Sequence, residues 1–297
     1  MAFKSGFVTI IGRPNVGKST LLNLLTGEKI AIMSNKPQTT RNTIQTVVTT
    51  GDYQVVFVDT PGMHRPKNKL GEYMMNVARN TFGEVDVVLL LADATDRDGA
   101  ATDKMITEEL AKTNTPVILL INKIDRVEKP ALLPLIQRYS ELHPFKAILP
   151  VSALDSGTVK IVMDELVKYL PEGELLYPED MLTDQHEKVL VQELIREKIL
   201  NLLSDEVPHG VAVEVTGFKE KREKNILEID ATIFCEKSSH KGIIIGKNGD
   251  MLKKIGTLAR QDAEKLFDIK IFLRLWVKVK EDWRNNDFIL KELGYKQ

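Results

Sequence analysis

The chain has 297 residues, a hydrophobic fraction of 43% and a formal net charge of -1. The length predicts about two domains with packed cores, and the balanced charge excludes an overall basic excess for nucleic acid, so any such site must be local. No apolar run reaches the roughly 18 residues of a transmembrane helix, and the single cysteine excludes a disulfide within the chain. We therefore expect a protein of the reducing cytoplasm.

A phosphate-binding loop is predicted near the start of the chain. An apolar strand at 7–11 and a helix at 20–25 flank an octapeptide that fits G-x-x-x-x-G-K-[ST]. The two glycines would let backbone N–H groups surround a phosphate, Lys18 would lie along the β and γ phosphates, and the Ser19 hydroxyl would bind Mg²⁺. The nucleotide-binding residues predicted here are Gly12, Arg13, Pro14, Asn15, Val16, Gly17, Lys18, Ser19 and Thr20.

The next loop, a polar segment at 30–43, is predicted to act as a switch. Thr40 is our choice for the residue whose hydroxyl and carbonyl close over Mg²⁺ and the γ-phosphate; Thr39 is the alternative that spacing leaves open. Loops of this kind are ordered by the γ-phosphate and released on hydrolysis.

A hairpin leads to the second predicted switch. Strands at 44–50 and 53–59 flank a two-residue turn and deliver Asp59-Thr60-Pro61-Gly62 into a loop. Asp59 would supply a carboxylate on the magnesium side, and the Gly62 N–H would reach the γ-phosphate. The predicted metal ligands are thus Ser19, Thr40 and Asp59, and the predicted catalytic residues are Lys18, Thr40 and Gly62.

Further apolar runs alternate with helical segments. A helix is predicted at 69–82, strands at 85–92, 117–121 and 147–151, and a last helix at 158–170. This alternation indicates an α/β domain with a mostly parallel sheet covered on both faces.

Two short motifs at strand ends predict guanine recognition. Asn122-Lys123-Ile124-Asp125 follows one strand, where open α/β sheets bind ligands. The Asp125 carboxylate could accept from N1–H and the 2-amino group of guanine, whereas adenine offers an acceptor at N1, so the mismatch disfavours ATP. Asn122 would bond the base edge and Lys123 cover the ring. Ser152-Ala153-Leu154 follows the next strand, and the Ala153 N–H could donate to guanine O6.

Residues 1–170 are therefore predicted to form a nucleotide-binding domain, followed by a helix-breaking linker at 171–184 and a second domain at 185–297. The second domain is predicted to be α+β, with the order α-β-β-α-GxxG-α-β and a helical tail. Its Gly246-Lys247-Asn248-Gly249 loop lies between two helices. The predicted RNA-binding residues are Lys241, Ile245, Gly246, Lys247, Asn248, Gly249, Lys253 and Lys254.

In this order the nucleotide motifs resemble those of the translation-factor-like bacterial GTPases. The second, smaller domain is similar to the prokaryotic type of KH domain, whose loop clamps unpaired nucleotides. The combination resembles a ribosome-assembly GTPase. The resemblance implies a monomeric, Mg²⁺-dependent GTPase that binds GTP and GDP, the 3′ end of 16S rRNA and the 30S subunit, with peripheral contact at the inner face of the cell membrane.

Two details qualify this resemblance. Met63 stands where signalling GTPases have a water-orienting Gln, so hydrolysis should be slow. The phosphate-loop Asn, here Asn15, is linked to a bound K⁺ in related members, which implies K⁺ as a second ion. The alternative function is a membrane-associated signalling GTPase whose C-terminal domain binds protein or lipid.

Overall fold

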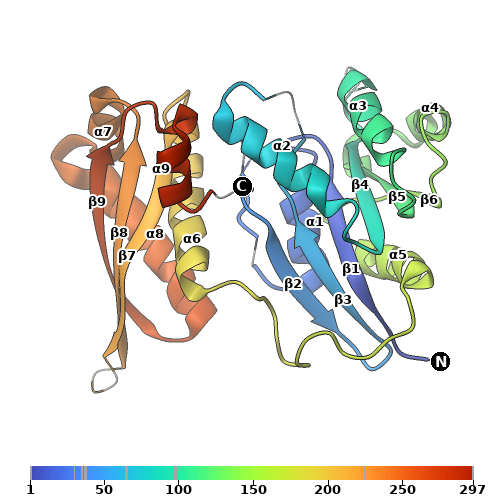
Figure 1. Cartoon of the computed structure of the whole chain (residues 1–297), viewed down its shortest axis with the longest axis horizontal. Helices are drawn as coiled ribbons and strands as arrows, with labels where there is room; N and C mark the ends of the chain where they lie inside the picture. Colours follow the sequence, from blue (N-terminus) through green and yellow to red (C-terminus); the bar gives the residue numbers. More distant parts are fainter. Residues whose placement is uncertain are drawn as a thin grey trace. The chain divides into compact units, whose positions relative to one another are not determined.

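The computed structural model describes residues 2–29, 31–34, 36, 39–63, 66–96, 100–221, 223 and 225–295. Part of the predicted first switch, including Pro37 and Gln38, lies outside the described residues. Two compact units are present (Figure 1): the first holds 1–33, 40–66 and 74–184, and the second holds 185–297 with the short segments 34–39 and 67–73.

The first unit is the predicted α/β fold. Its strands are β1 (Lys4–Ile11), β2 (Ile44–Thr49), β3 (Tyr53–Asp59), β4 (Val87–Asp93), β5 (Val117–Asn122) and β6 (Ala147–Pro150). They form one sheet in the order β2-β3-β1-β4-β5-β6, in which only the β2–β3 hairpin is antiparallel. Its helices are α1 (Lys18–Thr26), α3 (Ala100–Leu110), α4 (Leu132–Ser140) and α5 (Gly157–Leu166), together with the part of α2 (Lys69–Thr81) from residue 74 onward.

Strand β4 shows why the sheet is covered on both faces. All seven of its residues are buried. Val87, Leu89 and Leu91 join the core beneath α1 and α5, whereas Val88, Leu90 and Ala92 join the core beneath α2, α3 and α4. Because successive side chains of a strand point to opposite faces, a continuous apolar run is what a two-sided core requires.

The segment predicted as a linker runs along the β2–β3 side of this sheet. Gln54, fully buried, accepts from the backbone N–H groups of Leu176 and Tyr177 at 2.7 and 2.9 Å, and the Val47 N–H donates to Leu182 O at 2.9 Å. The Val47 bond satisfies a backbone group of the edge strand β2 that would otherwise face water, and the Gln54 bonds hold the 171–184 segment against β3. Residues 171–184 thus belong to the first unit by their contacts, although the domain boundaries themselves stay a prediction.

The second unit has the predicted α+β order. It comprises α6 (Glu187–Leu202), β7 (Ala212–Lys221), β8 (Ile226–Cys235), α7 (Ser238–Ile245), α8 (Asp250–Phe267), β9 (Lys270–Val279) and α9 (Asp287–Glu292). The sheet order is β7-β8-β9, with β7–β8 antiparallel and β8–β9 parallel. Helices α6 and α8 bury Ile195, Ile255 and Ala259 against one face of the sheet. Within the described ranges, no helix is both long and apolar enough to cross a membrane.

Candidate functional site

The phosphate loop joins β1 to α1, as predicted. Gly12 has φ 147° and Gly17 has φ 105°, in the region that favours glycine. A Cβ on Gly12 would lie 2.4 Å from Leu91 O, and one on Gly17 would lie 2.4 Å from Asn122 Nδ2. Glycine is therefore required by the neighbouring strands as well as by the approach of a phosphate.

Lys18 stands inside this loop. Its side chain is buried, and its Nζ donates to Gly12 O at 3.1 Å and Arg13 O at 2.9 Å. Burial lowers the pKa of Lys18 to about 8, against the opposing effect of the Asp59 charge. A phosphate beside this ammonium would favour the charged form, so the loop holds a cation that gains from an anionic ligand.

The three predicted metal ligands come together. Thr40 Oγ1 donates to Asp59 Oδ2 at 3.0 Å and lies 3.5 Å from Ser19 Oγ. Two hydroxyls and a carboxylate are hard oxygen donors, so these residues fit Mg²⁺. Thr39 instead bonds within its own loop, donating to Lys36 O at 2.7 Å. The geometry thus favours Thr40 over Thr39.

The second predicted switch approaches the same lysine. A Cβ on Gly62 would lie 3.1 Å from Lys18 Nζ and 3.2 Å from Pro14 N. The Met63 N–H donates to Gly12 O at 3.2 Å, but the Met63 side chain is fully buried in the core under α2. The thioether of Met63 thus packs with apolar side chains and its N–H is bonded to the phosphate loop, while the place of Met63 among the predicted GTP-binding residues stays a prediction.

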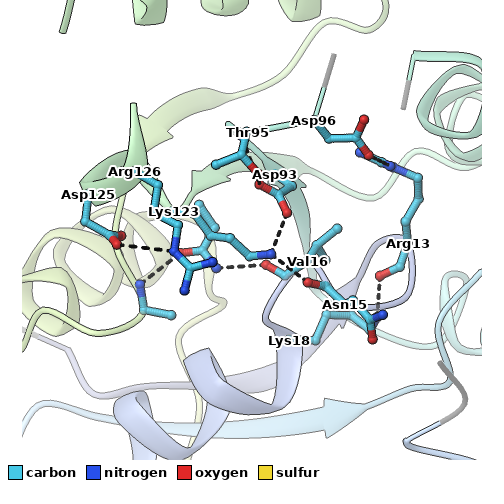
Figure 2. Close-up of polar contacts among 12 residues, drawn as sticks. Arg13, Asn15, Val16, Lys18, Asp93, Thr95, Asp96, Lys123, Asp125 and Arg126 are labelled. Atoms are coloured by element: carbon cyan, nitrogen blue, oxygen red, sulfur yellow. Dashed lines mark hydrogen bonds and ion pairs between the residues drawn. The ribbon is translucent and has the colours of Figure 1, made fainter. Parts of the chain in front are cut away.

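Lys123 ties the base-binding motif to the phosphate loop (Figure 2). Its Nζ donates to Asn15 O at 2.9 Å and to Asp93 Oδ2 at 2.5 Å. Although burial raises it, the bonds from Lys123 and Thr95 lower the pKa of Asp93 below its ordinary value. Asp93, at the carboxyl end of β4, was not predicted; its place at a strand end was the available signal.

The roles predicted for Asn122 and Ala153 are altered by a direct bond between them. The Ala153 N–H, expected on guanine O6, donates to Asn122 Oδ1 at 2.8 Å. Asn122 Nδ2 donates to Val16 O at 2.8 Å. An amide nitrogen carries two protons, so one remains for a base. Asn122, 2% exposed, connects two loops in this structure, and the donation of the Ala153 N–H to guanine O6 stays a prediction.

Asp125 is presented by the turn after β5. Its Oδ1 accepts from Ser152 Oγ at 2.6 Å, and its side chain is 38% exposed. Thr158, which the sequence analysis missed, fixes Ser152 in turn, donating to Ser152 O at 2.7 Å. The carboxylate is thus held in place by Ser152, while its Oδ2, 3.8 Å from the Arg126 Nε, lies on the partly exposed side where a base could be read.

The other predicted residues fall around this frame. Thr60 is buried and donates to Ile10 O at 3.3 Å. Ile124 lies in a short 3-10 turn, and Leu154 is 71% exposed beside the base motif. Thr20 lies in the first turn of α1, and Pro61 is buried between Thr60 and Gly62.

Arg13 is anchored by residues that the sequence analysis also missed. Its guanidinium donates to Asp103 on α3 at 2.7 Å and to Asp96, and Tyr139 on α4 donates to the other Asp103 oxygen at 2.6 Å. Burial opposes the charge on Arg13, but these bonds raise its pKa. The predicted contact residue Arg13 therefore positions the phosphate loop against two helices.

In the second unit the GxxG loop joins α7 to α8. Gly246 has φ 74°, and a Cβ there would lie 2.7 Å from Met251 Cβ. Gly249 has φ 83°, yet a Cβ there would meet nothing within 4 Å. Gly246 is therefore required by internal packing, whereas Gly249 leaves open space where a nucleotide backbone could approach.

Around this loop the predicted cations point to water. Lys241, Lys247, Lys253 and Lys254 are all exposed, and among the described residues none has an ion-pair partner. Ile245 is half-buried at the end of α7. A groove of about 370 Å³ begins at Gly249 and is lined by Leu252, Leu273 and Leu275, the apolar surface expected to take bases.

The fold and the site together define a phosphate-loop nucleotide-binding protein with a KH-type second domain. Comparisons with known proteins agree: the family of 50S ribosome-binding GTPases matches residues 7–123, and the KH domain family matches residues 206–284.

The full chain also has near relatives. GTPase Era of Ruminiclostridium cellulolyticum is 60% identical and covers 100% of this chain and 99% of its own length, and GTPase Era of Alkaliphilus metalliredigens is 55% identical over 99% and 100%. The chain belongs to the GTPase Era family.

Two solved structures of Era extend over the same length. Era in complex with MgGDPNP and nucleotides 1506–1542 of 16S ribosomal RNA is 40% identical, with a TM-score of 0.95, and covers 99% of this chain and 100% of its own. A point variant of Aquifex aeolicus Era bound to GDP and AlF4⁻ gives the same values.

Proposed function

We propose that this chain is a GTP-hydrolysing switch that binds 16S rRNA near its 3′ end and acts in assembly of the 30S ribosomal subunit. The observation that carries the proposal is the pair of sites on one chain, a guanine-type nucleotide site and an open GxxG loop. Support comes from the Era structure of the same length that holds MgGDPNP and a 16S rRNA fragment.

The nucleotide site supplies four groups to the reaction. Asp125 accepts from the guanine edge, and Lys18 places its charge along the β and γ phosphates. Thr40 and the Gly62 N–H contact the γ-phosphate, so both loops lose a partner when that phosphate leaves. Mg²⁺ would be held by Ser19, Thr40 and Asp59 and would neutralise phosphate charge.

Hydrolysis by the isolated chain should be slow. A fully buried Met63 can neither orient nor polarise an attacking water. The rate therefore depends on loop order and on charge at the phosphates, which suits a switch that persists until a partner is engaged.

K⁺ is a further part of the proposal. Asn15 is exposed on the phosphate loop, with its backbone in the left-handed region at φ 66°, and its side-chain oxygen could join a phosphate in binding a monovalent cation. Turnover should then rise when K⁺ replaces Na⁺ at equal ionic strength, and Asn15→Ala should remove the difference. Equal rates in both salts for the unaltered protein would discard K⁺.

We also propose a monomer in the cytoplasm, in contact with the 30S subunit and peripherally with the inner face of the membrane. The alternative, a signalling GTPase whose second domain binds protein or lipid, is disfavoured by the exposed lysines at the GxxG loop, since such a loop suits a nucleotide backbone.

Crosslinking in cells followed by sequencing of the attached RNA tests the proposal. Reads concentrated at the 3′ end of 16S rRNA are expected from the unaltered protein. Reads scattered over abundant RNAs, or recovery with membrane lipid that nuclease treatment does not release, would contradict it.

A further inference from the structure

The second sheet has a face that its helices do not cover. Helices α6 and α8 cover the side to which Ile271 and Val277 of β9 point. The alternate residues of β9 point to the other side, which Figure 1 shows facing the viewer with α8 behind the strands. We call these the β9 face: Lys270, Phe272, Arg274, Trp276 and Lys278, all exposed.

Two large aromatic rings stand on this face. Phe272 is 51% exposed and Trp276 is 45% exposed, whereas Trp283, the other tryptophan, is fully buried and donates from its indole to Gly210 O at 2.9 Å. The exposed pair contributes little to the core, because the inward residues of β9 already fill it. Aromatic rings left half in water are the groups on which bases stack.

Cations alternate with these rings. The Arg274 guanidinium carbon lies 5.6 Å from the centroid of Phe272, and Asp230 holds the guanidinium through bonds of 2.5 and 2.9 Å. Lys270 and Lys278 have no ion-pair partner in the part of the chain that the structure describes. The face therefore carries a lysine at both ends, of which Lys270 also interacts with the charge of Glu264.

The acidic neighbours on β8 do not cancel that charge. Glu228 and Asp230 lie opposite Phe272 and Arg274 in the register. Glu228 already accepts from Lys221 at 2.5 Å, and Asp230 is engaged by Arg274. Opposite Trp276 stands the neutral Thr232.

The pattern favours nucleic acid over protein as the occupant. Protein interfaces are depleted in lysine and bury a contiguous apolar centre, whereas here each ring is separated from the next by a cation. Single-stranded nucleic acid needs stacking surfaces for bases and cations for the backbone. Because β9 is an edge strand and also lines the groove below Gly249 through Leu273 and Leu275, a strand leaving that groove can pass round β9 to its other side.

We propose that the β9 face is a second single-stranded RNA surface, which extends the RNA segment bound at the GxxG loop. The inference rests on the proposed RNA-binding function and adds a site to it. It predicts two contact regions of different chemistry: a backbone clamp at the loop, and base stacking on Phe272 and Trp276.

The test uses the full-length protein and two oligonucleotides from the 16S rRNA 3′ end, one of four nucleotides, matched to the loop, and one of about twelve. The affinity of the double variant Phe272→Ala/Trp276→Ala for the longer RNA should fall about tenfold or more, because the stacking of bases on both rings is lost. Its affinity for the tetranucleotide should stay unchanged. Phe288→Ala removes a ring that is 77% exposed elsewhere and is the matched control.

Tryptophan fluorescence gives an independent readout, because Trp276 is exposed and Trp283 is buried. The longer RNA should quench the tryptophan fluorescence of the unaltered protein. The Trp276→Phe variant keeps a stacking ring, so it should still bind this RNA, but its fluorescence should not be quenched. Unchanged affinity of the double variant for the longer RNA, with affinity lost in Gly249→Asp, would overturn the β9 face and leave the loop site standing. Failure of the unaltered protein to bind either RNA would overturn both.

Discussion

The nucleotide site and the GxxG loop are both proposed to bind an anion, but they hold their polar groups in opposite ways. In the first, Lys18, Asp59 and Asn122 are at most 8% exposed and bonded to neighbouring loops. In the second, Lys247 and Lys253 extend into water without ion pairs among the described residues. Fixed groups in a dry site select by geometry, whereas mobile surface cations attract a backbone of any sequence.

Substitution of Lys18 should have the largest effect of all and tests the buried site of this comparison. Lys18→Ala removes the buried charge on the phosphates and should lower GTP turnover by about 100-fold or more. Met63→Ala, in contrast, empties core volume and should cost about 2 to 5 kcal/mol of stability with a smaller effect on turnover per folded molecule. Single-turnover hydrolysis and thermal unfolding of both variants provide the check. A Met63 variant as inactive as the Lys18 variant, yet equally stable, would place Met63 in the reaction.

Asp125 tests whether fixed geometry sets the choice of base. Asp125→Asn replaces an acceptor by a mixed donor and acceptor, so guanine affinity should fall about 10- to 100-fold and xanthine binding should improve. Competition against labelled GTP measures both. Glu128→Gln makes the same carboxylate-to-amide change at an exposed residue three positions further on, so it is the control and should leave the preference intact. Tight ATP binding by the unaltered protein would contradict the assignment of guanine.

Gly249 tests the open character of the loop, and Gly246 cannot, because a side chain there collides with Met251. Asp and Asn both tolerate the positive φ of Gly249 and have the same shape. Gly249→Asp should weaken single-stranded RNA about tenfold or more by repelling phosphate, and Gly249→Asn should weaken it less. The gap between the two variants should shrink at higher salt. Equal affinities for both variants and the unaltered protein would remove the loop from RNA binding.

The smallest expected effect is a pH dependence confined to the buried site. The pKa of Lys18 is lowered to about 8 by burial, and bound phosphate raises it. Below pH 8 the ammonium is charged with or without nucleotide, so affinity is constant there; above pH 8 binding must take up a proton, and affinity should fall by up to about tenfold per pH unit. GDP titrations from pH 7 to 9 measure this. Lys18→Arg, charged throughout, should flatten the profile.

The same contrast explains what could be predicted from the sequence. The strands and both loop motifs are local patterns, and the two strands of the β2–β3 hairpin appear within a residue of the predicted ranges. Strand β4 was predicted from Val85, but it begins at Val87 because the Asp86 carboxylate accepts from the Phe7 N–H at 2.8 Å. The resemblance supplied the family before any geometry was known.

What local patterns could not provide are bonds between loops distant in the sequence. The Ala153 N–H donates to Asn122, 31 positions earlier in the chain. Arg13 donates to Asp103, 90 positions later. Nothing in either segment alone marks its partner, since the pairing depends on which strand ends lie side by side. For the same reason, the bonds from the 171–184 segment to Gln54 were not foreseen.

The central claim is that this chain carries two separable anion sites, one for a guanine nucleotide and one for RNA. The most direct measurement titrates labelled GTP and a labelled oligonucleotide from the 16S rRNA 3′ end into the unaltered protein, Lys18→Ala and Gly249→Asp. The account predicts that Lys18→Ala loses GTP and keeps RNA, and that Gly249→Asp loses RNA and keeps GTP. Retention of both ligands by either variant, or loss of RNA in Lys18→Ala with GTP bound normally, would contradict it.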